Sequence, residues 1–312
     1  MTFKRRQFLT LAAFSGFGIG AIGFGLRSLA LKKDPNRTNT DLVTTLKDSD
    51  PLKNSLGPLQ LRLIATADSG SGDKNQFAVG RAMADYHTRS PFQLAILAGD
   101  NIYNSGEISK IKEAFEEPYG ELLKRGVKFR ACLGNHDIRT ENGVPQVKYA
   151  NFNMDDRYYT FTQGPAQFFV LETNTNVDWK TQMAWLTQQL EQSKAAWKIV
   201  YGHHPIYSSG IYGTNAEMVK RFSAVFKQHR VNLYVNGHEH HYERSRNIEG
   251  TTYLVTGHGG ASLRPVRMSE SSEFAVSRFG FSTIELYQNS MVLQGIGTDG
   301  KVFDRGIISQ WT

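Results

Sequence analysis

The chain has 312 residues, of which 40% are hydrophobic and 12% aromatic, enough to bury one large core or two modest ones. Its formal charge is +7, but four basic residues and no acid lie within positions 1–30, so the remainder carries 7 − 4 = +3. That excess is too small to indicate a nucleic-acid partner. The single cysteine, Cys132, excludes an internal disulfide, and its apolar neighbours in FRACLG favour a buried thiol.

The first thirty residues resemble an export signal. Arg5 and Arg6 precede a stretch without charge, residues 7–26, that contains five glycines, and SLA ends at Ala30. Paired arginines before a weakly hydrophobic, glycine-rich segment resemble a twin-arginine signal, which implies that the twin-arginine machinery exports the protein to the periplasm or beyond the cell. The alternative is an N-terminal membrane anchor, because about 20 uncharged residues can span a bilayer.

A tether and one catalytic domain are predicted after this segment. Residues 31–60 are polar, contain Pro35, Pro51 and Pro58, and show no period, as expected of a linker. From residue 61 onward no change in composition divides the chain, which predicts a single domain over 61–312.

Short apolar runs alternate with helix-like segments in this domain. The runs cover 61–67, 92–98, 127–133, 166–173, 197–202, 231–237 and 251–257, and the helix candidates cover 75–89, 107–125, 179–194 and 214–229. This alternation predicts an α/β architecture with helices covering the faces of the sheet. The further runs RYYTFT, FSTIELY and MVLQGI have no helices between them, which indicates a mixed sheet or two packed sheets.

Five of the apolar runs end in residue types that bind metal ions. Their ends carry Asp68; Asp100 and Tyr103; Asn135, His136 and Asp137; His203 and His204; and His238 and His240. In α/β sheets, ligands gather beyond the carboxyl ends of strands. One Gly-Asp or Gly-Asn pair usually marks only a turn, but oxygen ligands mixed with imidazoles at five strand ends have no common structural explanation. Asp100 is the candidate bridge between two ions ~3.5 to 4 Å apart.

These motifs, in the order Asp68, GDNIY, GNHD, VYGH and GHEH, resemble the dinuclear calcineurin-like metallophosphoesterases. Tyr103, three residues after Asp100, narrows the resemblance to the purple acid phosphatases. GHEHHYERS is similar to the final motif of the plant-type enzymes, and GDNIY to the mammalian tartrate-resistant type. The resemblance covers about 61–260. It implies a four-layer α-β-β-α sandwich of two mixed sheets, with a dinuclear metal site at the C-terminal ends of the strands.

The resemblance also implies the ligands of each ion. A ferric ion would be bound by Asp68, Asp100, Tyr103 and His240, and a divalent iron, zinc or manganese by Asp100, Asn135, His203 and His238. Charge arithmetic agrees with it. A trivalent and a divalent ion together carry +5, and three anionic ligands, including a tyrosinate, bring −3, which leaves +2 for a phosphate dianion. Two divalent ions with a neutral residue at 103 would also leave +2. The ordinary tyrosine pKa of ~10 must fall for this role, which coordination can achieve.

The implied reaction is hydrolysis of a phosphate monoester by an exported acid phosphatase, with a hydroxide held by the metal ions as nucleophile. His136 is the candidate acid for the leaving group and Asp137 the residue expected to hold it. One alternative is a phosphodiesterase or nucleotidase of the same fold with two divalent ions, against which Tyr103 argues. Another is a non-catalytic protein that binds metal or phosphate, against which His136 argues because neither ion needs it as a ligand.

Two departures from the family pattern affect the site. Ala67 replaces the usual glycine before Asp68, which leaves Asp73 as an alternative ligand. Relatives resemble one another in a histidine about nine residues after the fourth-motif histidine, where this chain has Tyr212. Because a phenol is a poorer acid near neutral pH, substrate preference and pH optimum are left open.

The other histidines receive separate interpretations. His204 is expected to pack beside the ligands or contact the substrate, and His258, in TGHGGA, to lie near the site or touch the substrate. His87 and His229 fall at helix ends, where an imidazole suits the helix dipole. If the chain stays extended after residue 236, His238 and His240 face one side with Cα atoms ~6.6 Å apart, one for each ion, and His241 faces away.

Overall fold

The structure, a computed structural model, describes residues 56–311. The expected export signal and residues 31–55 of the expected tether lie outside the described residues. Within residues 56–311, none of the helices combines the length and the apolar character that a membrane crossing requires. The part of the expected tether that is described ends in contact with the domain, since Leu56 packs against Tyr287 and Val292.

Two mixed β-sheets form the centre of the domain. The first holds six strands in the order β13 (Val302–Ser309), β12 (Ser290–Gly297), β11 (Gly280–Leu286), β1 (Leu61–Thr66), β2 (Leu94–Ala98) and β3 (Lys128–Cys132). The second holds seven in the order β10 (Ser272–Val276), β8 (Tyr242–Ser245), β9 (Thr252–Thr256), β7 (Leu233–Asn236), β6 (Trp197–Tyr201), β5 (Ala166–Val170) and β4 (Tyr159–Gln163). In each sheet the strands joined through helices run parallel, and the strands joined by turns run antiparallel.

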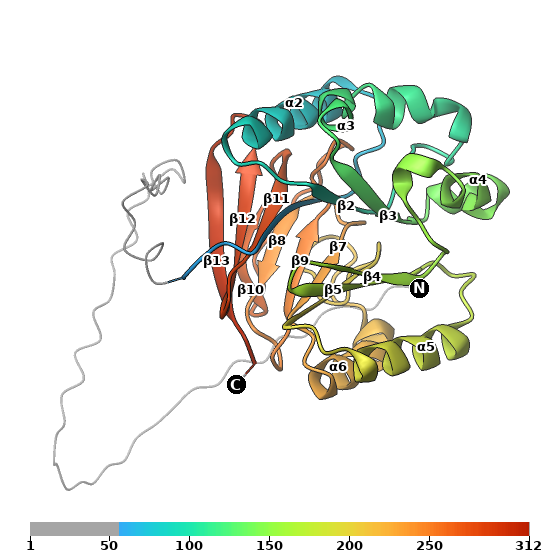
Figure 1. Ribbon diagram of the computed structural model, residues 1–312. Helices are drawn as coiled ribbons and strands as arrows, with labels where there is room; N and C mark the ends of the chain where they lie inside the picture. Colours follow the sequence, from blue (N-terminus) through green and yellow to red (C-terminus); the bar gives the residue numbers. More distant parts are fainter. Residues whose placement is uncertain (1–55, 312) are drawn as a thin grey trace, which may run out of the picture. The chain divides into compact units, whose positions relative to one another are not determined.

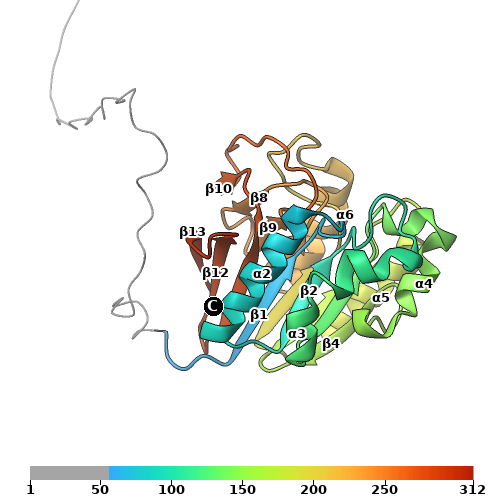
Figure 2. The same cartoon turned by 90° about the horizontal axis from the view of Figure 1, so that it is seen from above.

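Helices cover the outer face of each sheet. Helices α2 (Lys74–Arg89) and α3 (Gly120–Lys124) lie over the six-stranded sheet, and α5 (Trp179–Gln192) and α6 (Ala216–Gln228) lie against the seven-stranded one (Figures 1 and 2). Apolar side chains fill both the space between the sheets and the space under α5 and α6. The expected four-layer α-β-β-α sandwich is therefore confirmed.

Burial on two faces explains the continuous apolar runs. All five residues of β2, LAILA, are buried, as are Leu63 to Thr66 of β1, because one face meets helices and the other meets the second sheet. Polar residues mark where the long helices begin. Asp73 accepts hydrogen bonds from the main-chain N–H groups of Asn75 and Gln76 at the start of α2, and Asp178 begins α5 in the same way. The alternative that made Asp73 a metal ligand is wrong, since this exposed carboxylate is a helix cap.

The helix expected over 107–125 is broken into short pieces. It consists of a 3-10 turn at Ile108–Lys110, a π-helical turn at Lys112–Glu116 and the single turn of α3. Pro118 stands between the last two pieces and Gly120 begins α3, and neither residue supports a continuous helix. Four further short turns follow β3, at Asp137–Arg139, Glu141–Gly143, α4 (Val144–Val147) and Ala150–Phe152.

Strands β8, β10 and β13 were not predicted. They are short or carry charged residues in their interior, as in YERS and VFDRGIIS, so they lack an apolar alternation. Tertiary pairing compensates for these charges. Asp304 of β13 accepts two hydrogen bonds from the Arg244 guanidinium of β8, at 2.7 and 2.9 Å, and one from the Tyr242 hydroxyl at 2.8 Å. This buried ion pair joins the two sheets.

Replacing Asp304 should therefore weaken the sandwich. We expect Asp304→Asn to lower the free energy of unfolding by roughly 3 kcal/mol, because it leaves the Arg244 charge buried without its counter-charge. The matched control is Asp299→Asn, whose partner Arg278 forms a half-exposed pair at 2.7 Å. It should cost less than about 1 kcal/mol. Equal losses in the two variants, measured by chemical denaturation, would show that the cross-sheet pair has no special role.

Candidate metal centre

Five strand ends from both sheets meet at one place. Strands β1, β2 and β3 are parallel neighbours in the six-stranded sheet, and β6 and β7 are parallel neighbours in the other. The residues that follow them lie within hydrogen-bond distance of one another across the two sheets. As expected, the residues lie at the C-terminal ends of strands from two mixed sheets, at the place where the two sheets meet.

One group of side-chain atoms gathers around the Tyr103 hydroxyl. The Tyr103 oxygen lies 3.1 Å from Asp68 Oδ1, 3.0 Å from Asp100 Oδ2 and 3.2 Å from His240 Nε2. His240 Nε2 is in turn 3.3 Å from Asp68 Oδ1. Ligands at ~2.1 Å from one ion lie ~3.0 to 3.4 Å from each other, so this spacing fits a single metal ion. These four residues are the expected ligands of the first ion.

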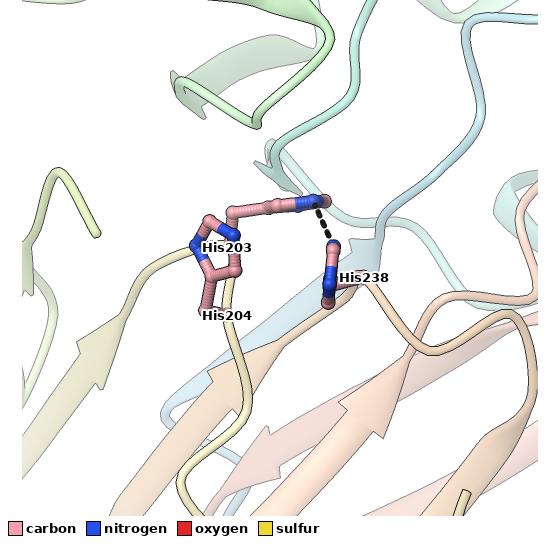
Figure 3. A group of neighbouring side chains, drawn as sticks. All are labelled: His203, His204 and His238. Carbon is pink, nitrogen blue, oxygen red and sulfur yellow. Dashed lines mark hydrogen bonds between the residues drawn. The ribbon is translucent and has the colours of Figure 1, made fainter. Parts of the chain in front are cut away.

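A second group gathers around Asn135. Its Oδ1 lies 3.1 Å from His203 Nε2 and 2.9 Å from His238 Nδ1, and the two ring nitrogens are 3.3 Å apart. Figure 3 shows His203 and His238 facing each other from different strand ends. His203 Nε2 is also 3.4 Å from Asp100 Oδ2. These residues are the expected ligands of the second ion, and their spacing fits an ion equally well.

Asp100 belongs to both groups through a single oxygen. Its Oδ2 contacts Tyr103 on one side and His203 on the other, while Oδ1 accepts a hydrogen bond of 2.9 Å from the His136 main-chain N–H. The expected bridging position is thus placed between the two groups, with one oxygen directed at both.

The electrostatics of the cluster favour positive charge at its centre. Burial by itself would raise the pKa of Asp100, but the charge of His203 holds it well below its usual range. Burial opposes charge on His203 as well, yet Asp100 raises the pKa of His203 to about 9. Burial and then the charges of Asp68 and Asp100 raise the pKa of Tyr103 far above its ordinary value. Without a cation the phenol keeps its proton, so a tyrosinate at this position depends on a bound ion.

The glycines before the candidate ligands are needed for space. A Cβ atom at Gly134 would lie 2.2 Å from Asp100 Oδ1, and one at Gly237 would lie 2.3 Å from Asp68 Oδ2. Any side chain at these positions would displace a carboxylate. The glycines therefore allow the main chain to pass directly against the ligand groups.

Main-chain carbonyls orient two of the imidazoles. His203 Nδ1 lies 3.0 Å from the Ala98 carbonyl, and His240 Nδ1 lies 2.8 Å from the Ser262 carbonyl. Each Nδ1 therefore donates a proton to a carbonyl, so that Nε2 is the atom directed into the cluster and would bind an ion after losing its own proton. Oxygen and neutral nitrogen donors in this arrangement suit a pair of metal ions.

Comparison with known proteins identifies the family. The model of the calcineurin-like phosphoesterases matches residues 61–242, more than half of the chain. The chain belongs to the calcineurin-like phosphoesterase family. Purple acid phosphatase 7 of Arabidopsis thaliana is 26% identical over 235 residues, covering 65% of this chain and 71% of the relative. Tartrate-resistant acid phosphatase type 5 of Sus scrofa is 25% identical over 292 residues, covering 77% and 84%.

A solved structure supports the fold. GAP50, the anchor in the inner membrane complex of Plasmodium, superposes with a TM-score of 0.72 at 21% identity, covering 82% of this chain and 90% of that one. At this identity the likeness concerns the fold alone. The curated relatives confirm the resemblance to purple acid phosphatases, and this family of hydrolases depends on two metal ions.

Other groups of this phosphoesterase surround the cluster. His136 lies beside Tyr103, with ring centroids 4.5 Å apart, and its Nε2 is 4.0 Å from Asp100 Oδ2. Its Nδ1 donates to the Asn104 carbonyl at 2.6 Å, and Arg139 reaches Nε2 at 3.3 Å. The expected acid is therefore next to the metal groups, oriented by the Asn104 carbonyl.

The expectation that Asp137 holds His136 is wrong. The buried Asp137 carboxylate accepts hydrogen bonds from the main-chain N–H groups of Asn101, Ile102 and Gly134, at 2.7 to 3.1 Å, and from Gln146. Burial and the charge of Asp100 raise the pKa of Asp137 to about 7. Its contacts tie the loop after β2 to the loop after β3, so Asp137 sets the distance between two ligand-bearing loops.

His204 and Tyr212 both lie beside His238. The His204 and His238 ring centroids are 4.5 Å apart, and His204 Nδ1 lies 2.9 Å from the Thr173 hydroxyl. Tyr212, which is 60% exposed, stacks on the His238 ring, with the two ring centroids 4.6 Å apart. Burial, aided by the positive charges of His203 and Arg264, lowers the pKa of His238 to about 2, so this imidazole is neutral and able to bind metal.

His258 cannot contact a substrate. It is fully buried, its ring packs against Tyr242 and Phe303, and Nδ1 lies 3.1 Å from the Arg278 carbonyl. The expectation of a substrate contact is wrong, because the apolar rings separate this imidazole from solvent. The glycines beside it do approach the site, since a Cβ atom at Gly257 would lie 2.6 Å from Asp68 Oδ2.

The chain after β7 turns instead of continuing extended. His238 has a φ of 69°, a left-handed conformation that places His238 with the second group and His240 with the first. We expected the two histidines to belong to different ions, but through an extended chain and not through a left-handed residue. His241 Nε2 and Glu243 Oε2 form a buried pair at 3.1 Å, and Glu239 accepts a 2.6 Å hydrogen bond from the Tyr212 main-chain N–H. Nothing in the sequence pattern marked Glu239, Arg139 or Thr173 as neighbours of the site.

The buried His258 should make the stability depend on pH. Burial lowers the pKa of His258 to about 3, against ~6.5 in an unfolded chain. Between these values the unfolded chain binds a proton and the folded protein does not. This contribution to stability is therefore complete above pH ~6.5 and is lost as the pH falls toward 3.

We expect His258→Gln, which keeps a donor for the Arg278 carbonyl, to remove about 2 kcal/mol of the stability difference between pH 7.5 and pH 5. Chemical denaturation of both proteins at the two pH values measures it. An unchanged difference in the variant would show that His258 is not the source.

Proposed function

We propose that this protein is an exported acid phosphatase that hydrolyses phosphate monoesters with a ferric ion and a divalent iron, zinc or manganese. The observation that carries the proposal is the place of the Tyr103 hydroxyl, between Asp68 and Asp100 and next to His240. A phenolate there supplies the third negative charge that a trivalent ion needs. The curated relatives, which include purple acid and tartrate-resistant acid phosphatases, support the same choice.

The two metal ions, when bound, would neutralise the phosphate dianion and activate a water molecule for attack. The chain itself supplies position and proton transfer. Asp100 Oδ2 fixes both ligand groups around one point, and the Asn104 carbonyl orients the His136 ring beside it. A protonated His136 can then give its Nε2 proton to the leaving oxygen, which lowers the energy of the departing alkoxide.

Export through the twin-arginine machinery is part of this proposal, and the N-terminal segment is either removed or kept as an anchor. The second candidate function, hydrolysis of diesters or nucleotides with two divalent ions, uses the same ligands except Tyr103. The part played by Tyr103 therefore separates the two candidates.

Colour tests the role of Tyr103. The purified protein should contain iron together with one divalent metal per chain and absorb visible light through a tyrosinate-to-iron transition. Tyr103→Phe should abolish that absorption and weaken iron binding. The control is Tyr212→Phe, which changes a tyrosine beside the site and should keep the colour. A colourless protein with only zinc or manganese, active on a diester, would favour the second candidate.

Leaving-group dependence tests His136. His136→Gln should lower kcat on an alkyl phosphate about a hundredfold or more, while kcat on 4-nitrophenyl phosphate, whose leaving group needs little protonation, changes far less. Metal content measured on the same samples should stay at the wild-type level. Full activity of the variant on the alkyl ester would rule out the acid role.

A further inference from the structure

Arg264 is tied to the loop that carries two candidate ligands. It lies in the connection between β9 and β10. Its main-chain N–H donates to the His240 carbonyl at 3.0 Å, and its Nη1 donates to the His238 carbonyl at 2.8 Å. Both ends of this half-buried arginine are therefore fixed to the segment between the two metal groups, so its charge has a defined place beside them.

The guanidinium also faces the exposed aromatic ring next to the site. Its central carbon lies 5.3 Å from the centroid of the Tyr212 ring, which itself stacks on His238. The loops that carry these two residues are joined below, where Glu243 accepts hydrogen bonds from Ser209 at 2.7 Å and from Ser272 at 2.6 Å. Arg264 and Tyr212 therefore form a rim beside His238, and buried polar contacts hold this rim in place.

Acidic side chains do not neutralise this arginine. Within residues 56–311, the contacts of Arg264 are a carbonyl and an aromatic ring, and it takes part in no ion pair. The acids of the neighbouring segment, Glu239 and Glu243, are buried, and they accept hydrogen bonds from the Tyr212 main-chain N–H and the Ser209 hydroxyl. Arg139, beside His136 on another side of the cluster, likewise contacts the Asn104 carbonyl and an imidazole and pairs with no carboxylate in this part of the chain.

The charge balance of the site makes this surplus informative. Two ions and their anionic ligands leave +2, and a phosphate dianion together with the attacking hydroxide brings −3. The guanidinium groups of Arg264 and Arg139 add +2, so one positive charge remains beside the cluster. Arg264, next to His238, is positioned to meet the part of the substrate beyond the phosphate. A fixed arginine is suited to bind carboxylate or phosphate oxygens through two parallel N–H groups.

We propose that Arg264 recognises a second oxyanion, a carboxylate or a phosphate, on the leaving group, so that the preferred substrates are monoesters of anionic alcohols. This inference rests on the proposed phosphatase function and adds the class of alcohol to it. Arg264 is a specificity residue in this proposal, since its guanidinium contacts the main-chain carbonyl of His238 but no side chain of the candidate ligands. The Tyr212 ring under it limits where the leaving group can lie.

Matched aryl esters test the proposal. The substrates are phenyl phosphate, 4-carboxyphenyl phosphate and 1,4-phenylene bisphosphate, compared by kcat/KM in the wild type, Arg264→Gln, Arg264→Lys and the control Arg267→Gln, an exposed position on the same loop. Arg264→Gln should lower the preference for the anionic esters over phenyl phosphate about tenfold or more, with most of the change in KM. Arg264→Lys should retain part of it, and Arg267→Gln all of it. The ester with the larger change identifies the oxyanion.

A binding measurement separates this inference from the phosphatase proposal. Calorimetric titration of the metal-loaded protein with phenylphosphonate and 4-carboxyphenylphosphonate, which are not hydrolysed, should show the same loss of discrimination in Arg264→Gln. If no ester is hydrolysed but the phosphonates are discriminated, the function is wrong and the role of Arg264 stands. If Arg264→Gln weakens charged and neutral ligands equally, or the wild type does not discriminate, Arg264 only supports the loop and the inference is overturned.

Discussion

The repulsion between acidic oxygens at the junction of the two sheets is the constraint on which the site depends. The Tyr103 hydroxyl lies 3.1 Å from Asp68 and 3.0 Å from Asp100, and the two buried carboxylates have oxygens within 4.8 Å of each other, a separation at which both stay charged only beside a counter-charge. The surrounding groups respond to this demand, since Asp100 raises the pKa of His203 and the two carboxylates raise that of Tyr103. Cations relieve the repulsion, which is why the same residues can serve as ligands.

The fold supplies the rigidity that such a cluster needs. The strands before Asp68 and Asp100 are buried on both faces near their carboxyl ends, so these ends cannot move apart to relax the repulsion. Asp137 fixes two of the loops to each other through main-chain N–H groups, and glycines such as Gly134 let the main chain pass against the carboxylates. Packing in the surrounding layers therefore offsets the unfavourable free energy of concentrating negative charge in the cluster.

The rim formed by Arg264 and Tyr212 differs from the metal groups in how it is built. The metal groups consist of side chains at strand ends, whereas the rim consists of two longer connections that accept support from the buried carboxylates of Glu239 and Glu243. These connections carry Tyr212 and Arg264, so the groups that meet the substrate beyond its phosphate can vary without disturbing the metal ligands. Such a division lets one metal centre serve different esters.

The sequence by itself determined the α/β class, the family, the long helices α2, α5 and α6, and the seven residues that meet at the metal groups, because each ligand follows an apolar run of clear pattern. The sequence did not predict strands β8, β10 and β13, because they lack a clear apolar pattern. The charge of Arg244 in β8, for example, is compensated only by Asp304 of the other sheet. Only the tertiary structure decided that Asp137 joins loops instead of holding His136, that His258 is enclosed by Tyr242 and Phe303, and that Arg264 reaches His238. These roles depend on contacts between residues far apart in the chain, which local spacing does not encode.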